Sequence, residues 1–323
     1  MKKIAILTTG GTIAGKITPN GYKAAVLSGN ELVSNLLNLE PNLIKFAQIS
    51  CVEVCNVASQ DMSENLLFKL AQMAQNALID NDGIVILHGT DTLEESAYFL
   101  NLVLNTKKPV VLTGSMRPSD DPSWDGANNI IDAIIIASSD QAIKKGVLVV
   151  FNGEIHSSRE ISKTHTINLN AFSSLNTGKI GVVGKFDKNI QKCVKIYLNP
   201  LRKHTFLSDF HNIKSLAKVA LIYAYQDFDL DFDLSKFDGI VVAGLGNGNL
   251  NQKLLADLKR LENSGKIVIL SSRTGSGNLT QNGENSDFII ADNLNPQKAR
   301  ILLACILAKT KDVNLIKSYF DEY

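Results

Sequence analysis

The chain has 323 residues, which is enough for one large or two moderate domains with a sizeable core. Its 33 basic and 32 acidic residues give a formal net charge of +1, and no basic stripe is visible, so neither nucleic acid nor an anionic membrane is an expected partner. No run approaches the roughly 18 consecutive apolar residues of a membrane-spanning helix.

Short apolar runs alternate with amphipathic segments along the first half of the chain. The short runs are typical of buried strands, and the leucines and alanines between them have helical spacing. The predicted order is strand 3–8, helix 61–78, strand 84–87, helix 93–104, strand 110–113, helix 128–137 and strand 147–151. This β-α-β-α order indicates a mainly parallel sheet with helices on both faces.

Periodicity fades between 185 and 212 and then resumes. Asn295-Pro296 is a strong helix start, an N-cap residue followed by proline at the first helical position. The other elements expected here are strands 219–223, 240–243 and 267–270 and a helix over 250–261. The sequence therefore predicts an α/β fold with an N-terminal catalytic domain at 1–192, a linker at 193–212 and a smaller C-terminal α/β domain at 213–323.

Two threonines follow predicted strands in glycine-containing turns. Thr12 ends Gly10-Gly11-Thr12 after the first strand, and Thr90 lies in His88-Gly89-Thr90-Asp91 after strand 84–87. In one parallel sheet both turns would open at the carboxyl edge, where open α/β sheets bind their ligands. A hydroxyl placed there, with Asp91 beside it and a lysine elsewhere, could attack a carbonyl carbon.

The turn around Thr12 does not match a nucleotide-binding loop. Its glycines lack Gly-x-Gly-x-x-Gly spacing, and Lys16 lacks the Ser or Thr that follows a P-loop lysine. On glycine content alone a plain tight turn is favoured. A threonine nucleophile, however, needs exposure, N–H donors for an oxyanion and a proton acceptor. We expect Gly10-Gly11 to supply the exposure and the donors, and the polar stretch 17–22 to form a lid that carries Tyr22.

The turn at 88–95 has a purely structural alternative. Thr90 or Asp91 could cap the next helix, with Glu94 as the capping-box partner. That alternative does not account for several polar side chains gathered at the end of one strand. Asp91 could instead bind an ammonium group while a lysine orients Thr90, and His88 is expected to make a structural hydrogen bond.

A third polar turn, Thr113 to Asp120, follows strand 110–113. Arg117 is expected to lock this loop through its several N–H donors. The five histidines lack His-x-x-x-His or other metal-ligand spacing, so no metal site is expected. The sequence also has no Gly-x-Ser-x-Gly elbow.

These motifs together resemble the bacterial L-asparaginase family, and the similarity is greater to its high-affinity, exported type II subgroup than to the cytoplasmic one. The matching segments follow the family order over nearly the whole chain: 8–15, 58–62, 88–92, 114–119, 244–249 and 294–300. The resemblance implies a hydrolase without cofactor or metal that converts L-asparagine to L-aspartate and ammonia. It also implies a homotetramer, a dimer of intimate dimers, with each active site between the N-terminal domain of one subunit and the C-terminal domain of another.

The resemblance assigns catalytic roles position by position. Thr12 matches the primary nucleophile, and Tyr22 matches the lid tyrosine that assists its deprotonation. Thr90, Asp91 and Lys163 match a second polar group. The implied reaction is covalent: Thr12 attacks the side-chain amide, ammonia leaves, and water hydrolyses the β-aspartyl ester. The residues alone leave open which threonine attacks first and what accepts its proton.

The resemblance also implies a set of substrate-binding residues. The α-carboxylate and α-ammonium groups of the substrate would be held by Ser59, Gln60, Thr90 and Asp91. Asn249 and Glu284 match residues that a neighbouring subunit contributes. Glutamate at position 284, aligned through Thr280-Gln281, goes with a preference for asparagine, so only minor L-glutaminase activity is expected.

Two positions depart from the family pattern. Ser115 stands where alanine is usual, which would add a hydroxyl near the second polar group. Trp124 stands where a smaller residue is commoner.

Two other functions remain open. An amidotransferase subunit could use the same groups to supply ammonia to a charged tRNA, although such proteins carry an extra N-terminal domain and here the first strand begins at Lys3. A non-catalytic amino-acid binding protein could bury its ligand at the same sheet edge, but it has no use for two activated hydroxyls beside Asp91 and Lys163.

The expected location is the cytoplasm, or the periplasm if the chain is a processed mature form. The apolar run after Lys2-Lys3 is shorter than the roughly 7–15 residues of a signal-peptide core, so a core strand is expected there. Cys51 and Cys55 in one strand would lie ~13 Å apart and could not pair. Four free thiols suit a reducing compartment.

Overall fold

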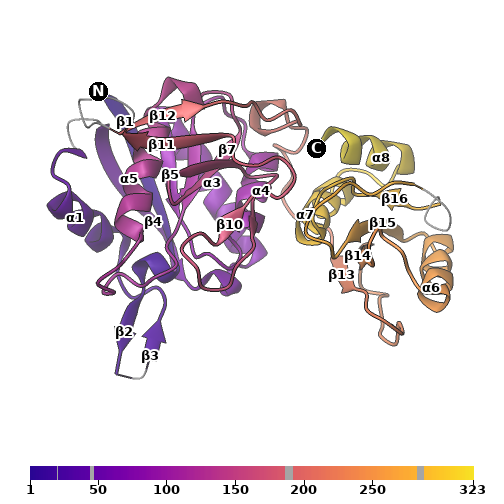
Figure 1. The fold of residues 1–323 in the computed structure, drawn as a ribbon. Helices are drawn as coiled ribbons and strands as arrows, with labels where there is room; N and C mark the ends of the chain where they lie inside the picture. Colours follow the sequence, from indigo (N-terminus) through magenta and orange to yellow (C-terminus); the bar gives the residue numbers. More distant parts are fainter. Residues whose placement is uncertain (20, 44–46, 186–191, 282–286) are drawn as a thin grey trace. The chain divides into compact units, whose positions relative to one another are not determined.

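The computed structural model describes residues 1–323 apart from 20, 44–46, 186–191 and 282–286. The chain divides into two units, residues 1–209 and residues 210–323, each built on its own sheet (Figure 1). The predicted fold class is confirmed, because the larger sheet is mainly parallel with helices on its faces and the second unit has a separate parallel sheet.

The first unit contains an eight-stranded sheet with the order β12-β11-β8-β7-β6-β5-β1-β4. The strands from β7 to β4 run parallel, and β8, β11 and β12 extend the sheet antiparallel. The bounds are β1 Lys2–Gly10, β4 Ala47–Val57, β5 Gly83–Leu87, β6 Val110–Thr113, β7 Val147–Phe151, β8 Glu154–Ser157, β11 Gly181–Lys185 and β12 Lys192–Ile196. The strand order reverses between β1 and β5, and open α/β sheets bind ligands at such a point.

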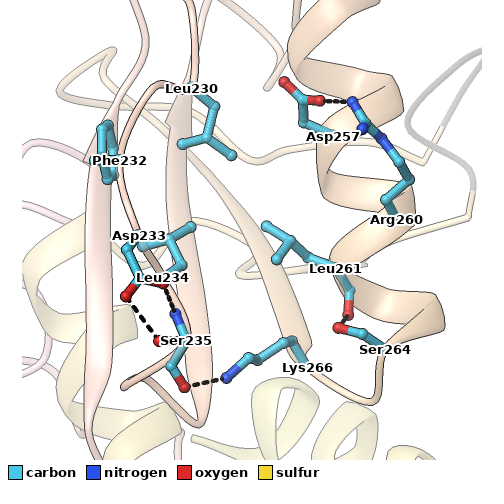
Figure 2. Close-up of a pocket in the computed structure, with 10 residues that line it drawn as sticks. All are labelled: Leu230, Phe232, Asp233, Leu234, Ser235, Asp257, Arg260, Leu261, Ser264 and Lys266. Atoms are coloured by element: carbon cyan, nitrogen blue, oxygen red, sulfur yellow. Dashed lines mark hydrogen bonds and ion pairs between the residues drawn. The ribbon is translucent and has the colours of Figure 1, made fainter.

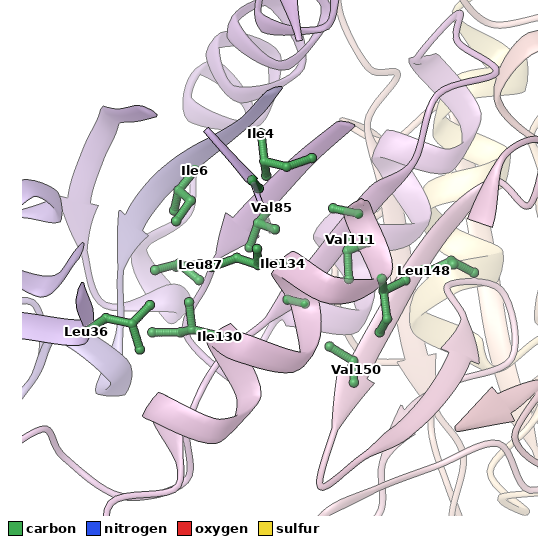
Figure 3. Close-up of a cluster of buried hydrophobic side chains, with 14 of the residues drawn as sticks. Ile4, Ile6, Leu36, Val85, Leu87, Val111, Ile130, Ile134, Leu148 and Val150 are labelled. Carbon is green, nitrogen blue, oxygen red and sulfur yellow. The ribbon is translucent and has the colours of Figure 1, made fainter. Parts of the chain in front are cut away.

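Helices cover both faces of this sheet. Helices α1 (Gly29–Leu39) and α5 (Gly126–Ala137) contribute to one cluster of buried side chains. Alternate strand residues point into that cluster, where Ile4, Val85 and Leu148 gather around Ile134 of α5 (Figure 3). Helices α3 (Glu64–Asp80) and α4 (Leu93–Val103) contact the same strands from the other face. Strands buried on both sides explain the continuous apolar runs in the sequence.

Smaller elements complete the first unit. Two short antiparallel hairpins pair β2 with β3 and β9 with β10. Their bounds, with those of the 3-10 turns, are β2 Lys16–Thr18, β3 Gly21–Lys23, β9 Ser162–Lys163, β10 Phe172–Ser173, η1 Thr12–Ala14, η2 Ser59–Asp61, η3 Asp140–Ala142 and η4 Thr205–Leu207.

The second unit has a four-stranded parallel sheet with the order β13-β14-β15-β16. The predicted helix start is confirmed: Asn295 caps α7 by accepting a hydrogen bond from the N–H of Lys298 at 3.0 Å, and Pro296 is its first residue. The bounds are β13 Val219–Tyr223, β14 Gly239–Gly244, β15 Ile267–Ser272, β16 Ile289–Ile290, α6 Gln252–Asn263, α7 Pro296–Leu307 and α8 Val313–Glu322.

The structure adds detail that the sequence pattern did not predict. The stretch expected as a linker, 193–212, includes most of β12, which pairs with β11 at the edge of the large sheet.

All four cysteines are free. Across the described residues, no helix is long and apolar enough to cross a membrane and no group of His, Cys, Asp or Glu is arranged to hold a metal ion.

Candidate active site

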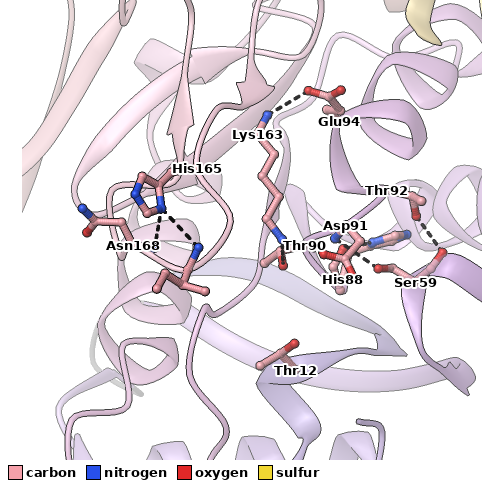
Figure 4. A network of polar contacts seen from close by, with 12 residues as sticks. Thr12, Ser59, His88, Thr90, Asp91, Thr92, Glu94, Lys163, His165 and Asn168 are labelled. Atoms are coloured by element: carbon pink, nitrogen blue, oxygen red, sulfur yellow. Dashed lines mark hydrogen bonds and ion pairs between the residues drawn. The ribbon is translucent and has the colours of Figure 1, made fainter. Parts of the chain in front are cut away.

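The turns after β1 and β5 meet at the point where the strand order reverses. Gly11 has a φ of +82°, and a Cβ atom on it would lie 2.3 Å from the Cα of Gly89. A Cβ atom on Gly89 would in turn lie 2.8 Å from the Oγ of Ser59. Only glycine permits so close an approach of two backbones. The two glycines therefore bring Thr12, Thr90 and Ser59 to one edge of the sheet (Figure 4).

Thr12 opens the η1 turn directly after β1 and is half-buried. The Tyr22 hydroxyl donates a hydrogen bond to Thr12 Oγ1 at 3.0 Å. Tyr22 reaches it from β3, because the predicted lid is an ordered β2-β3 hairpin in its described residues. Burial raises the pKa of Tyr22; the bond to Thr12 opposes this rise, and the negative charge of Asp91 adds to it to a smaller extent. The phenol is thus neutral at physiological pH and acts as a donor in this state.

Lys163 joins the two polar side chains that follow β5. Its ammonium group donates to Thr90 Oγ1 at 2.9 Å and to Asp91 Oδ1 at 2.6 Å. Thr90 and Lys163 are largely buried, whereas 63% of the Asp91 side chain is exposed. The lone pair of Thr90 that faces Lys163 is occupied, so its own O–H is free to point elsewhere. Asp91 keeps an open carboxylate face for a cationic group.

Glu94 holds the backbone of Lys163 and is not a capping residue. Its carboxylate accepts a hydrogen bond from the Lys163 N–H at 3.0 Å. The N-cap position of α4 is Thr92, which has no side-chain capping bond and donates instead to the carbonyl of Ser59 at 2.7 Å. The structural alternative for this turn, a capping box, is therefore wrong. The sequence pattern indicated an interaction of Glu94 with the N-cap residue, whereas in the structure Glu94 binds the backbone of Lys163.

Ser59 lies buried in η2, against the turn that follows β5. Its Oγ accepts a hydrogen bond from the N–H of Asp91 at 3.2 Å, and the hydroxyl proton remains available for an anion. Gln60, the next residue, is exposed. These two residues lie after β4, so three adjacent strands supply the groups at this edge.

One expected role of the glycine turn is corrected by the backbone hydrogen bonds. The N–H of Gly11 donates to the carbonyl of Val57 at 2.9 Å. This donor belongs to the junction of β1 with β4 and is not available to an oxyanion. The two consecutive glycines serve the close approach to neighbouring backbone: a Cβ atom on Gly10 would lie 2.5 Å from the Val57 oxygen.

The loop after β6 supports the site from one side. Arg117 donates through Nη1 to the Ser123 carbonyl at 3.1 Å, as expected for a residue that locks the loop. Ser115 is fully buried and donates to the carbonyl of Arg117 at 2.6 Å, so its extra hydroxyl serves the loop and not the group around Thr90. His88 makes the expected structural bond, with Nδ1 2.8 Å from the Gly89 oxygen. Burial lowers the pKa of His88 to about 4, so it is neutral at pH 7.

The two residues expected from a neighbouring subunit are not among the groups described at this edge. Asn249 is exposed in the second unit, where its backbone forms a bridge with Leu245. Glu284 lies outside the described residues.

The second unit has an open groove that none of the predicted residues lines (Figure 2). Apolar side chains such as Leu230 and Leu261 line it. Its polar groups bond to one another, for example Lys266 to the Ser235 carbonyl at 2.8 Å and Asp233 to Ser235. The cluster in the first unit therefore remains the candidate site.

The first unit thus has the α/β fold of enzymes that bind their ligands at the point where the strand order reverses, and the two threonine hydroxyls found there are each hydrogen-bonded to a titratable side chain. Family models match both units: "Asparaginase, N-terminal" over residues 3–195 and "Glutaminase/Asparaginase C-terminal domain" over residues 218–320. The chain belongs to the asparaginase family.

Individual relatives are similar over the full chain. "L-asparaginase 2" of Bacillus subtilis is 40% identical, covering 100% of this chain and 87% of the relative. "Probable L-asparaginase periplasmic" of Haemophilus influenzae is 36% identical, covering 100% and 93%. The solved structure of a probable cytoplasmic L-asparaginase from Campylobacter jejuni has a TM-score of 0.89 at 37% identity and covers 100% of both chains. The expected family is confirmed.

Proposed function

We propose that this protein hydrolyses L-asparagine to L-aspartate and ammonia through a covalent intermediate on Thr12, with minor activity on L-glutamine. The observation that carries the proposal is the contact of the Gly11 and Gly89 backbones, which gathers two partnered hydroxyls at one edge. Membership of the asparaginase family supports the substrate class.

In the first half-reaction, Thr12 Oγ1 bonds to the side-chain carbonyl carbon of asparagine. The C–N bond then breaks, and the departing NH₂ takes up the proton lost by the threonine, so ammonia leaves. Tyr22, a neutral donor at 3.0 Å, orients the oxygen of Thr12 before attack. It also lies close enough to relay a proton between nucleophile and leaving group.

In the second half-reaction, water adds to the β-aspartyl ester and the bond to Thr12 breaks, which releases aspartate. The group of Thr90, Asp91 and Lys163 suits this step. Because Lys163 occupies one lone pair of Thr90, the Thr90 hydroxyl can face the ester and position the water.

The α-substituents of the substrate have complementary groups beside the two threonines. The exposed carboxylate of Asp91 suits an ammonium group, and the Ser59 hydroxyl, which receives the Asp91 N–H, suits a carboxylate. Gln60 is exposed beside Ser59 and adds a neutral donor. A pair of opposite charges on one carbon is the signature of an α-amino acid, so recognition at this edge favours free amino acids over longer amides.

Ammonia release with L-asparagine, L-glutamine and D-asparagine, assayed in parallel, tests the function. We expect turnover of L-asparagine, slow turnover of L-glutamine and loss of turnover in Thr12→Ala and Thr90→Val with the fold intact by circular dichroism. Near-normal ammonia release in either variant would contradict the assignment. Tight asparagine binding without ammonia release would instead support an amino-acid binding protein.

We also propose a homotetramer in which Asn249 and Glu284 complete the site of a neighbouring subunit. The proposal rests on the family, and subunit complementation tests it. Thr12→Ala and Asn249→Ala tetramers should each be nearly inactive, whereas tetramers reassembled from both should regain activity, because some sites then combine intact halves. Absence of recovery in mixed tetramers confirmed by mass would contradict a shared site.

The cytoplasm remains our proposal for the compartment. Relatives of similar identity are named for both compartments, cytoplasmic and periplasmic. Fractionation of source cells, with activity measured in the periplasmic and cytoplasmic extracts, tests it directly. Activity confined to the periplasmic extract would overturn it.

A further inference from the structure

The hairpin that carries Tyr22 is too small to hold its own position. Strands β2 and β3 pair over three residues each, and all three residues of β3 are exposed. Tyr22 itself is 52% exposed. A two-stranded hairpin of this kind is at best marginally stable in water. The 3.0 Å bond from Tyr22 to Thr12 therefore needs external support for the hairpin.

One set of backbone hydrogen bonds fixes the C-terminal end of the hairpin to the η1 turn. Backbone N–H groups of Ala25 and Val26 donate to the carbonyls of Gly11 and Ala14, at 3.1 and 2.7 Å. These bonds fix the segment that follows β3 and do not involve β2.

A second set of hydrogen bonds, from the loop after β6, fixes β2. The carboxylate of Asp120 accepts the N–H of Ile17 with both oxygens, at 3.1 and 2.9 Å. Ser119 adds two bonds to the carbonyl of Gly15, from its N–H at 2.9 Å and its hydroxyl at 2.7 Å. Ile17 is the register partner of Tyr22 in the hairpin. Asp120 thus holds the backbone directly opposite the tyrosine.

The loop that presents Asp120 is itself well fixed. Asp125 accepts the N–H groups of Met116 and Arg117, each at 3.0 Å, and the side-chain amide of Asn129 at 3.1 Å. Asn129 lies on α5, which packs on the sheet. The support therefore runs from the core through the loop to the hairpin.

We propose that Asp120 is a positioning residue for the reaction, and that it acts by holding Ile17 so that Tyr22 stays on Thr12. The bond is charge-assisted, which makes it stronger than a bond between neutral groups. The effect of Asp120 on the reaction rests on the function proposed above, whereas its support of the hairpin does not depend on that function.

A double-mutant cycle tests the proposal. Asp120→Ala should lower kcat about tenfold while changing KM little, and Asp120→Asn, which keeps one acceptor oxygen, should recover part of the loss. In a Tyr22→Phe background, Asp120→Ala should change kcat less than about twofold, because its target is already gone. The matched control is Asp121→Ala, whose carboxylate bonds within the loop to Ser123, and it should keep wild-type kcat.

Limited proteolysis gives a readout that does not depend on activity. Lys16 begins β2 and Lys23 ends β3, and the two residues pair with each other in the hairpin. Trypsin should cut after them several times faster in Asp120→Ala than in wild type or Asp121→Ala. Unchanged cleavage in Asp120→Ala would overturn the support role even if the protein proves not to be an asparaginase. Faster cleavage with an equal loss of kcat in the wild-type and Tyr22→Phe backgrounds would overturn the action through Tyr22.

Discussion

Replacement of Gly11 by alanine tests the contact that brings the two threonines together. Gly11 has φ +82° and ψ −168°, a region open essentially to glycine alone, and an alanine there costs about 1–3 kcal/mol. The new Cβ would also lie 2.3 Å from the Cα and 2.5 Å from the N of Gly89. Both are backbone atoms, which cannot rotate away, and overpacking of this kind costs about 1–3 kcal/mol.

The two costs together amount to about 2–6 kcal/mol, which corresponds to a fall of about 5–20 °C in Tm for a unit of this size. Because the turns must separate, we also expect ammonia release from L-asparagine to fall at least a hundredfold. The assay is a thermal melt by circular dichroism with steady-state kinetics on the same preparation.

Gly178→Ala is the matched control for this variant. Gly178 also has a positive φ, +72°, but an added Cβ would meet nothing within 4 Å. It should lose a few degrees in Tm and keep its activity within twofold. A Gly11→Ala protein with Tm within about 2 °C of wild type and kcat within threefold would refute the close approach of the turns.

Three further predictions concern single side chains of the site. Lys163→Met should lower kcat at least ~100-fold, because Thr90 and Asp91 lose the shared donor that orients them. Single-turnover kinetics measure this loss, and activity within fivefold of wild type would contradict the role of Lys163. Tyr22→Phe should lower kcat by ~10²–10³, and the wild-type to variant ratio should stay constant from pH 7 to 9, because the raised pKa of Tyr22 keeps the phenol protonated there; a ratio that falls across this range would count against a neutral donor. His88 has a pKa of about 4 in the folded state against its ordinary 6.5, so the unfolded chain binds more protons between these values. The stability that the buried neutral His88 gives the folded protein is therefore fully present above pH 6.5. As the pH falls to 4, the free energy of unfolding decreases by about 3 kcal/mol, at about 1.4 kcal/mol per pH unit. Urea unfolding at pH 4.5 and pH 7 should show a smaller difference in this free energy for His88→Gln than for wild type, and equal differences would contradict the buried neutral imidazole.

Much of the fold could be predicted because burial on both sheet faces leaves a strong local pattern. The run at 84–87 became β5 with every residue buried, and Asn295-Pro296 began a helix as its capping chemistry requires. Helix α1 was missed although its signal was local: Ser28 and Glu31 form a capping box. The sequence pattern did not predict the antiparallel strands β8, β11 and β12. Strand β8 is buried but has only four residues, Glu-Ile-His-Ser, without an apolar run, and β11 and β12 are short and only partly buried, so all three carry weak periodicity.

Some residues of the site could be predicted from local sequence patterns, and others depend on contacts between residues far apart in the chain. Thr12 and Thr90 follow apolar strands, so their outlet at one edge was predictable from pattern alone. Lys163 was not, because its bond to Thr90 spans 73 residues and no local feature marks it; the family resemblance supplied it. The bond from Asp120 to Ile17 spans 103 residues, and neither pattern nor resemblance pointed to it. Tertiary contacts decide such pairings.

The most direct test of the central claim is to find where the substrate becomes attached. Thr90→Val should slow hydrolysis of the ester more than its formation, so the intermediate should accumulate when the variant is mixed with L-asparagine and quenched in acid. Mass spectrometry of the digested protein should show one added aspartyl group on the peptide that contains Thr12. An aspartyl group on any other residue, or the same adduct in Thr12→Ala, would contradict the account.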